Sequence, residues 1–353
     1  MNTNDETSEI PIQPLQFAEF FFTSSDNDRL FLLVLKCYIN PAISIFGLAA
    51  NFLGMTILRS SGLNKASNVL LFGLALADSL AIFFTINVAE MLLFFDPTKK
   101  YPRLAGWQYD QNVSFILYLL RSAFYFVGDW GAYVNTTIPA IITCERLVAI
   151  FSPLHFKKYI TAKFAVVSVV ISFVFWIPLS AFFHYVTPFD YVRISNTTYM
   201  GIWKLSDYYI NNSRVILIVN NYVFEIMSSW APVCFVTVGC IAIWIKVKIT
   251  MRKRRNLGAA DRGSNTSTRT TKTLLATCAF FASTHFLYSV LIYIFDPDFF
   301  IYQKQFIVYE IMHSIYLINN SSNFFVYVAF NKKLWLIFKR MVFPQSRKRM
   351  INY

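Results

Sequence analysis

The chain has 353 residues, of which 56% are hydrophobic and only 14% are charged, and its mean hydropathy is +0.46. A soluble core cannot bury that much apolar surface, so the composition indicates a protein that crosses a membrane several times. The net charge of +13 does not indicate nucleic acid as a partner, because the basic residues lie in short segments between apolar stretches and report membrane topology instead.

Seven apolar stretches are each long enough to cross about 30 Å of hydrocarbon as a helix, which predicts an all-α seven-transmembrane helix bundle. They cover residues 32–58, 68–95, 115–150, 161–186, 216–248, 271–295 and 304–330. The domain 32–330 would follow an extracellular tail, 1–31, and precede a cytoplasmic segment, 331–353. In that segment, basic and apolar side chains interleave over 331–341, which predicts an amphipathic helix on the inner leaflet of the lipid bilayer.

The distribution of charge predicts the orientation. Most of the 32 Lys and Arg residues lie in 59–67, 151–163, 246–272 and 331–353, so these segments are expected in the cytoplasm and the N-terminus outside the plasma membrane. The acidic N-terminal tail lacks the features of a cleavable signal peptide. Three glycosylation sequons then fall in predicted outer loops, at Asn112, Asn196 and Asn211.

All five cysteines lie inside apolar stretches and lack the spacing of a metal site, so we expect them to be small buried hydrophobic residues. They are Cys37, Cys144, Cys234, Cys240 and Cys278. Trp176 and Pro232, in the fourth and fifth stretches, are expected to have structural roles. Trp176 would pack between helices, and Pro232 would free a backbone carbonyl.

Asp78 lies in the middle of the second stretch, where an unpartnered carboxylate is very costly. Amide side chains at similar depth in other stretches are its candidate partners, namely Asn51, Asn135, Asn319 and Asn323. The chemistry leaves two alternatives open. The cluster is either a site for water and a hard cation such as sodium, or a set of hydrogen bonds that joins the helices.

The third stretch ends in the adjacent charged pair Glu145–Arg146, which indicates function because charged residues are costly in a membrane helix. In the outer halves, acidic and aromatic residues are expected to surround a cavity for a cationic ligand. The pocket candidates are Glu90, Asp129, Tyr133, Glu225, His285, Tyr288, Glu310 and His313. Alternatively, some of the acids pair with Lys36, Arg121 or loop lysines.

In order and depth, several of these residues resemble the motifs of a rhodopsin-like (class A) G protein-coupled receptor over about 32–341. The motifs are Asn51, LALAD around Asp78, Glu145-Arg146-Leu147 followed by SPL, Trp176, Pro232, and Asn323 four residues before Tyr327. The loop pattern most resembles invertebrate neuropeptide-receptor-like and molluscan chemosensory-type members. The resemblance implies an extracellular peptide or small-molecule ligand, a heterotrimeric G protein as partner, no enzymatic activity, and no cofactor beyond a possible sodium ion at Asp78.

The resemblance also implies roles for individual residues. Glu145 would hold Arg146 at rest, and activation would release Arg146 toward the G protein α-subunit. Pro153 and Leu154 would lie in the loop that docks the G protein. In the seventh stretch, Asn323 and Tyr327 would rotate inward, and Asp78 with its four candidate amide partners would form the sodium and water cluster.

The chain departs from the family pattern at several positions. Arg121 stands where a cysteine usually forms the outer disulfide, His285 replaces an aromatic residue, and Leu287 replaces the proline of the sixth stretch. Similarly, Phe324 and Cys240 replace a Pro and a Tyr. Gly128 and Leu317 occupy the positions of the amine-binding Asp and the retinal Lys, which disfavours an amine receptor or an opsin.

The competing function is an ion-coupled transporter or channel, in which Asp78 and the outer acids would form an ion path. It would be expected to show internal repeats or broken helices, and neither is visible in the sequence. A membrane enzyme is disfavoured further, because the four histidines lie in separate segments without a catalytic motif.

Overall fold

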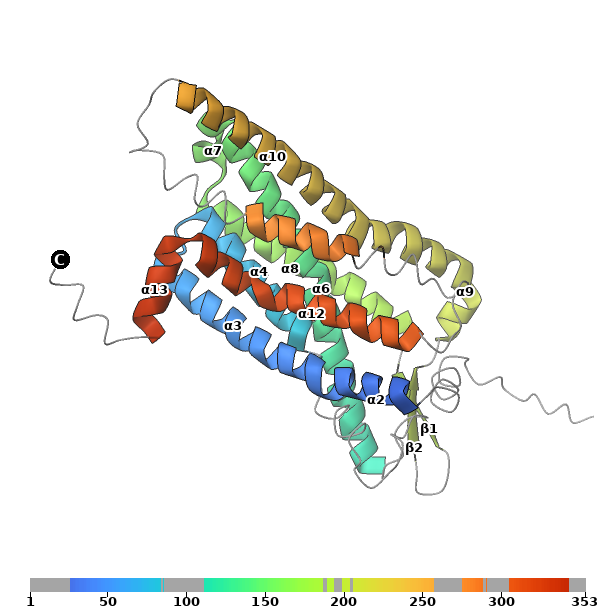
Figure 1. Ribbon diagram of the computed structural model, residues 1–353. Coiled ribbons are helices and arrows are strands. Elements are labelled where there is room, and N and C mark those ends of the chain that lie inside the picture. The colour runs from blue at the N-terminus through green and yellow to red at the C-terminus, as the bar shows by residue number, and fades with distance from the viewer. Residues whose placement is uncertain are drawn as a thin grey trace, which may run out of the picture.

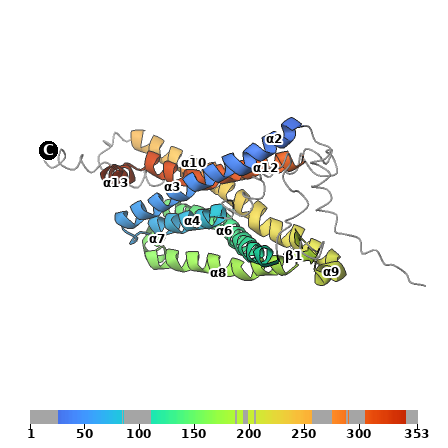
Figure 2. The same cartoon turned by 90° about the horizontal axis from the view of Figure 1, so that it is seen from below.

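The chain forms a bundle of long helices in the computed structural model, which describes residues 26–83, 85, 111–186, 189–193, 199–203, 206–256, 275–287, 290 and 305–342. The long helices run side by side along one axis (Figures 1 and 2). This architecture confirms the predicted all-α membrane bundle.

The helices follow the predicted stretches closely. The first span comprises α2 (Asp26–Val34), the π-helical η1 (Leu35–Ile39) and α3 (Asn40–Ser61), and the second is α4 (Ala66–Phe83). The third span is α6 (Gln111–Phe151), followed by the short α7 (Pro153–Tyr159), and the fourth is α8 (Ala162–Val186). The remaining helices are α9 (Asp207–Ile218), η3 (Val219–Phe224), η4 (Ile226–Trp230), α10 (Ala231–Asn256), Leu275–Leu287, α12 (Gln305–Phe330) and α13 (Lys332–Val342).

Five of the described helical segments are long and apolar enough to cross a membrane, and Leu275–Leu287 is a shorter apolar helix at the place of the sixth span. The seventh span, α12, is more polar because NNSSN lies in its middle. These amides face the interior, since Asn319, Asn320 and Asn323 are all nearly inaccessible to solvent. Their polarity therefore serves contacts within the bundle.

The helix α4 lies at the centre of the bundle and contacts α3, α6, α8 and α12. Ala77, Ala81 and Ile82 on this helix are completely buried. Its close approach to α6 requires Gly131, because a Cβ there would lie 2.5 Å from the backbone nitrogen of Ala81. The periphery is apolar instead, as on α8 and α10, where large side chains such as Ile171 and Val238 are exposed. Such a surface suits lipid.

The fifth span changes its helical pitch just before Pro232. The N–H of Ala231 donates to the carbonyl of Ile226, and that of Glu225 donates to the carbonyl of Asn220. Both bonds span five residues, as in a π-helix. Pro232 has no N–H to offer to the carbonyl four residues earlier, so the preceding turns are widened.

The two ends of the bundle differ. At one end, β1 (Phe189–Arg193) and β2 (Tyr199–Trp203) form an antiparallel hairpin near α2 and α9, in the loop predicted to lie outside (Figure 1). At the opposite end lie α7, the end of α10 and α13 (Figures 1 and 2). The helix α13 buries Leu334, and its Lys333 Nζ donates to the Ser61 carbonyl, 3.3 Å away at the end of α3.

The prediction that all five cysteines are buried is wrong for two of them. Cys37, Cys240 and Cys278 are buried, whereas Cys144 and Cys234 are exposed on the outside of the bundle. All five are reduced thiols, as expected from the absence of a cysteine at Arg121. Position in an apolar stretch does not determine burial, because a membrane helix presents apolar residues to lipid as well as to its neighbours.

Candidate functional site

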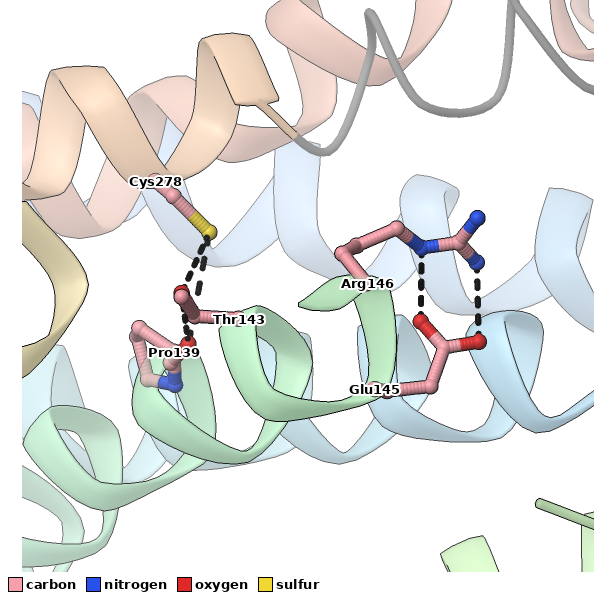
Figure 3. Close-up of polar contacts among 5 residues, drawn as sticks. All are labelled: Pro139, Thr143, Glu145, Arg146 and Cys278. Carbon is pink, nitrogen blue, oxygen red and sulfur yellow. Dashed lines mark hydrogen bonds and ion pairs between the residues drawn. The ribbon is translucent and has the colours of Figure 1, made fainter. Parts of the chain in front are cut away.

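Glu145 and Arg146 form a two-pronged ion pair at the end of α6 (Figure 3). Arg146 Nε donates to Glu145 Oε2 at 2.6 Å, and a terminal guanidinium nitrogen donates to Oε1 at 2.9 Å. Both residues are buried, with 2% and 8% of their surfaces exposed. A bidentate, charge-assisted pair of this kind is strong and geometrically defined, so it holds the guanidinium against its own helix.

The residues that follow this pair lie at the same end of the bundle. Leu147 is half-buried, and Pro153 opens α7, in which it is exposed. Leu154 is 88% exposed although it is a large apolar residue. An exposed leucine so close to a buried ion pair gives this end of the bundle an apolar contact point.

Asp78 is completely buried and accepts a 2.7 Å hydrogen bond at Oδ2 from the amide of Asn323. The other predicted partners converge on Asn320 instead. Asn135 Nδ2 donates to Asn320 Oδ1 at 2.8 Å, and Asn51 Nδ2 donates to its carbonyl oxygen at 3.0 Å. A longer bond of 3.4 Å runs from Asn319 to Asn320 Oδ1.

Asn320 is thus the residue of this cluster that sequence reasoning missed. Its spacing of three residues from Asn323 was an available signal, since residues at i and i+3 share a helix face.

Several buried polar atoms of the cluster have no protein partner among the described residues. They are Asp78 Oδ1, Asn51 Oδ1, Asn320 Nδ2 and the hydroxyl of Tyr327. Such groups are costly unless water or an ion satisfies them. The two oxygens fit a small cation, which takes oxygen ligands, whereas the amide nitrogen of Asn320 is a donor and fits a water molecule.

The three outer acids that the structure describes have different surroundings. Asp129 has a half-exposed carboxylate 3.5 Å from Nε2 of His184 on α8, and Glu225 is exposed on the fifth span. Glu310 is buried, accepts a 3.0 Å hydrogen bond from Asn40 and lies 3.6 Å from Lys36 Nζ. The alternative interpretation, pairing with Lys36, is therefore confirmed for Glu310.

The other pocket candidates have mixed surroundings. Tyr133 stacks on Trp176 with ring centroids 5.0 Å apart, and His285 is buried 4.2 Å from the ring of Phe281. His313 Nε2 lies 3.2 Å from the hydroxyl of Thr85, a contact between α12 and the end of the second span. Glu90 and Tyr288 lie outside the described residues.

The structure describes Trp176 and one of the three glycosylation candidates. Trp176 is 2% exposed and donates from Nε1 to Thr137 Oγ1 at 2.8 Å, so its packing between helices agrees with the prediction. Asn211 is exposed on α9, near the hairpin end of the bundle. The side chain of Asn112 and the whole of Asn196 lie outside the described part of the chain.

The chain matches the family described as serpentine type seven-transmembrane G protein-coupled receptor chemoreceptor Srw over residues 38–342, and it belongs to that family. It is therefore a multi-pass membrane protein.

A curated relative supports the same class. The chain is 24% identical over 225 residues to a protein of Caenorhabditis elegans described as a probable G-protein coupled receptor. The alignment covers 63% of this chain and 48% of the relative, so the chain spans about half the length of that protein.

Proposed function

We propose that this protein is a chemosensory receptor of the plasma membrane, with its N-terminus outside and its C-terminus in the cytoplasm. An extracellular ligand would shift the helix bundle from a resting to an active arrangement, and the active form would promote nucleotide exchange on a heterotrimeric G protein. A ligand achieves this by binding the active arrangement more tightly. The order of motifs from Asn51 to Tyr327 supports a rhodopsin-like plan.

The Glu145–Arg146 pair is the observation that carries the proposal. Both guanidinium bonds go to the neighbouring carboxylate, so Arg146 is held within α6 and turned away from a partner protein. Exposed Leu154 lies at the same end, where most of the basic segments predict cytoplasm. This arrangement fits a resting receptor in which release of Arg146 is the step that a ligand promotes.

Substitution of Arg146 tests the proposal. Arg146→Ala should abolish GTPγS binding by a promiscuous Gα subunit in cell membranes, both basal and stimulated by compounds from a chemical library. Surface expression should be largely preserved, because the substitution lies at the helix end. The control is Cys144→Ser, at an exposed neighbouring position on the same helix. Full signalling from Arg146→Ala would disprove the assigned role.

The ligand class that we propose is a small chemosensory compound, since the matched family is one of chemoreceptors. A neuropeptide is the second candidate and is supported only by the resemblance of the loop pattern. A cationic group on the ligand would meet Asp129, whose carboxylate is half-exposed, more easily than Glu310, which Lys36 and Asn40 already engage. Asp129→Asn should therefore weaken responses to cationic compounds selectively.

We also propose that Asp78 binds a sodium ion as an allosteric modulator, with Asn51 as a second oxygen ligand. The two unpartnered buried oxygens support this assignment. Sodium chloride should raise the melting temperature Tm of the purified receptor above its value in choline chloride of equal ionic strength, because a ligand stabilises the state that it binds. Asp78→Asn should remove the difference. An unchanged sodium effect in that variant would favour the purely structural cluster.

A further inference from the structure

The sixth span lacks a carboxylate that could hold Arg146. The sequence contains no Asp or Glu between Arg262 and Phe295, and Arg146 is engaged by Glu145 within α6 itself. An ion pair between the third and sixth spans is therefore not available to keep the bundle closed at this end. Any restraint on the sixth span at this end would therefore come from a different contact.

Cys278, in the described part of the sixth span, makes polar contacts with the third span (Figure 3). Its Sγ lies 3.5 Å from the hydroxyl oxygen of Thr143 and 4.0 Å from the carbonyl oxygen of Pro139. Thr143 Oγ1 is itself 2.8 Å from that carbonyl, to which it donates. The Thr143 hydroxyl therefore shares its one hydrogen between that carbonyl and Cys278 Sγ, to which it also donates, and the Cys278 thiol, a weak donor, donates to the Pro139 carbonyl. Both side chains are almost fully buried.

The fifth span completes this cluster. Cys240 on α10 belongs to the same cluster of buried residues as Cys278. Next to it, Gly239 lets α10 approach the third span, because a Cβ at that position would overlap the Cγ2 atom of Thr143. Three helices therefore meet at Thr143. By contrast, Ser283 and Thr284, further along the sixth span, bond to carbonyls of their own helix.

We propose that Cys278 is a positioning residue that seats the sixth span against Thr143 of the third span in the resting receptor. Separation of these two spans would then accompany the release of Arg146, which lies three residues beyond Thr143 on α6. Loss of the contact favours the separated arrangement and raises activity in the absence of ligand. The consequence for activity rests on the proposed receptor function, whereas the seating itself does not.

Basal GTPγS binding per receptor at the cell surface measures this effect in the full-length protein. Cys278→Ala and Thr143→Val each remove one partner and should raise basal binding about twofold to fivefold, the range expected for one weak buried hydrogen bond. Cys278→Ser retains a donor and should keep the native value. Ser283→Ala is the matched control, since that hydroxyl bonds only within its own helix among the contacts described. An equal rise in Ser283→Ala would overturn the proposal.

A distance measurement tests the contact between Cys278 and Thr143 without depending on G protein coupling. Spin labels are placed on the exposed Cys144 and on L275C, in a Cys234→Ser background that removes the other exposed thiol. In the purified receptor without G protein, Cys278→Ala and Thr143→Val should add a longer component to the distance distribution, and Cys278→Ser and Ser283→Ala should not. If neither of the first two variants changes the distribution, the proposal is wrong.

The distance measurement and the nucleotide-exchange measurement test different parts of the proposal. Lengthened distances without nucleotide exchange in any variant would support the seating by Cys278 and contradict the proposed G protein coupling. Should Cys278→Ala fail to reach the surface, Thr143→Val tests the same contact from the other helix. Gly239→Ala adds a third approach, because its methyl group displaces Thr143 while leaving Cys278 intact, and it should raise basal activity in the same way.

Discussion

Asn320 joins three helices through a single side chain and its backbone. Asn135 of α6 donates to its side-chain oxygen, Asn51 of α3 donates to its carbonyl, and Asn320 itself belongs to α12. One turn further on, Asn323 reaches Asp78 of α4. Four helices are thus connected by amide contacts within one helical turn of α12, deep in the apolar core.

Replacement of Asn320 should therefore lower the thermal stability of the receptor by more than the small size of the asparagine side chain suggests. Asn320→Ala leaves the buried amide of Asn135 without its acceptor, and each such loss costs about 1–3 kcal/mol. We expect the Tm of the purified receptor to fall by several degrees. Ser322→Ala, two residues further on, is the control because Ser322 bonds only to the Asn319 carbonyl of its own helix among the contacts described. Equal losses in both variants would contradict the assigned connection.

Some of these side-chain contacts were predicted from the sequence and others were not. Asn323 was predicted as a candidate partner of Asp78, because an isolated charge in a membrane helix must find a partner, and the resemblance to the receptor family implied that Glu145 holds Arg146. The central position of Asn320 was not predicted, since four other asparagines were named as the candidate partners of Asp78. Which amide reaches which acceptor depends on helix rotation, and a single sequence specifies rotation only weakly.

The internal irregularities of the helices were not predicted. Pro232 indicated a freed carbonyl, whereas the run of π-helical turns from Val219 to Trp230 had no local sequence signal. The neighbours of the outer acids also depend on details that the sequence does not specify. Asp129 and Glu310 were placed in the correct spans, but their side chains turn to different neighbours, His184 and Lys36.

Among the helices, α7 is the segment that would contact the G protein under the proposed function. Leu154→Asp puts a charge on its exposed apolar contact point and should reduce GTPγS binding roughly tenfold, about what the loss of one well-buried leucine contact at an interface would give. Surface expression should stay native, since Leu154 is 88% exposed. Tyr159→Ala at the other end of α7 is the control. Native signalling from Leu154→Asp would place the contact elsewhere.

At the scale of the whole molecule, polar contacts are concentrated along the axis of the bundle. Asp78 and its amides lie in the core, Glu145–Arg146 and Cys278 lie nearer the predicted cytoplasmic end, and the Glu310 pair lies on the opposite half of α12. The outer surface of the bundle is apolar, including Cys144 and Cys234. Composition predicted this division in general, because a membrane protein places its few charges where other helices or water can satisfy them.

The hairpin of β1 and β2 closes the predicted outer loop through backbone pairing, with Phe189 opposite Trp203 and Arg193 opposite Tyr199. All five cysteines are reduced thiols, so this closure involves no covalent bond. Millimolar dithiothreitol should therefore leave the Tm of the purified receptor unchanged, whereas a receptor with an outer disulfide, measured in parallel, should lose stability. A clear fall in Tm would contradict this expectation. The receptor can then be screened against volatile thiols and other reducing odorants at concentrations that would damage a disulfide-bonded receptor.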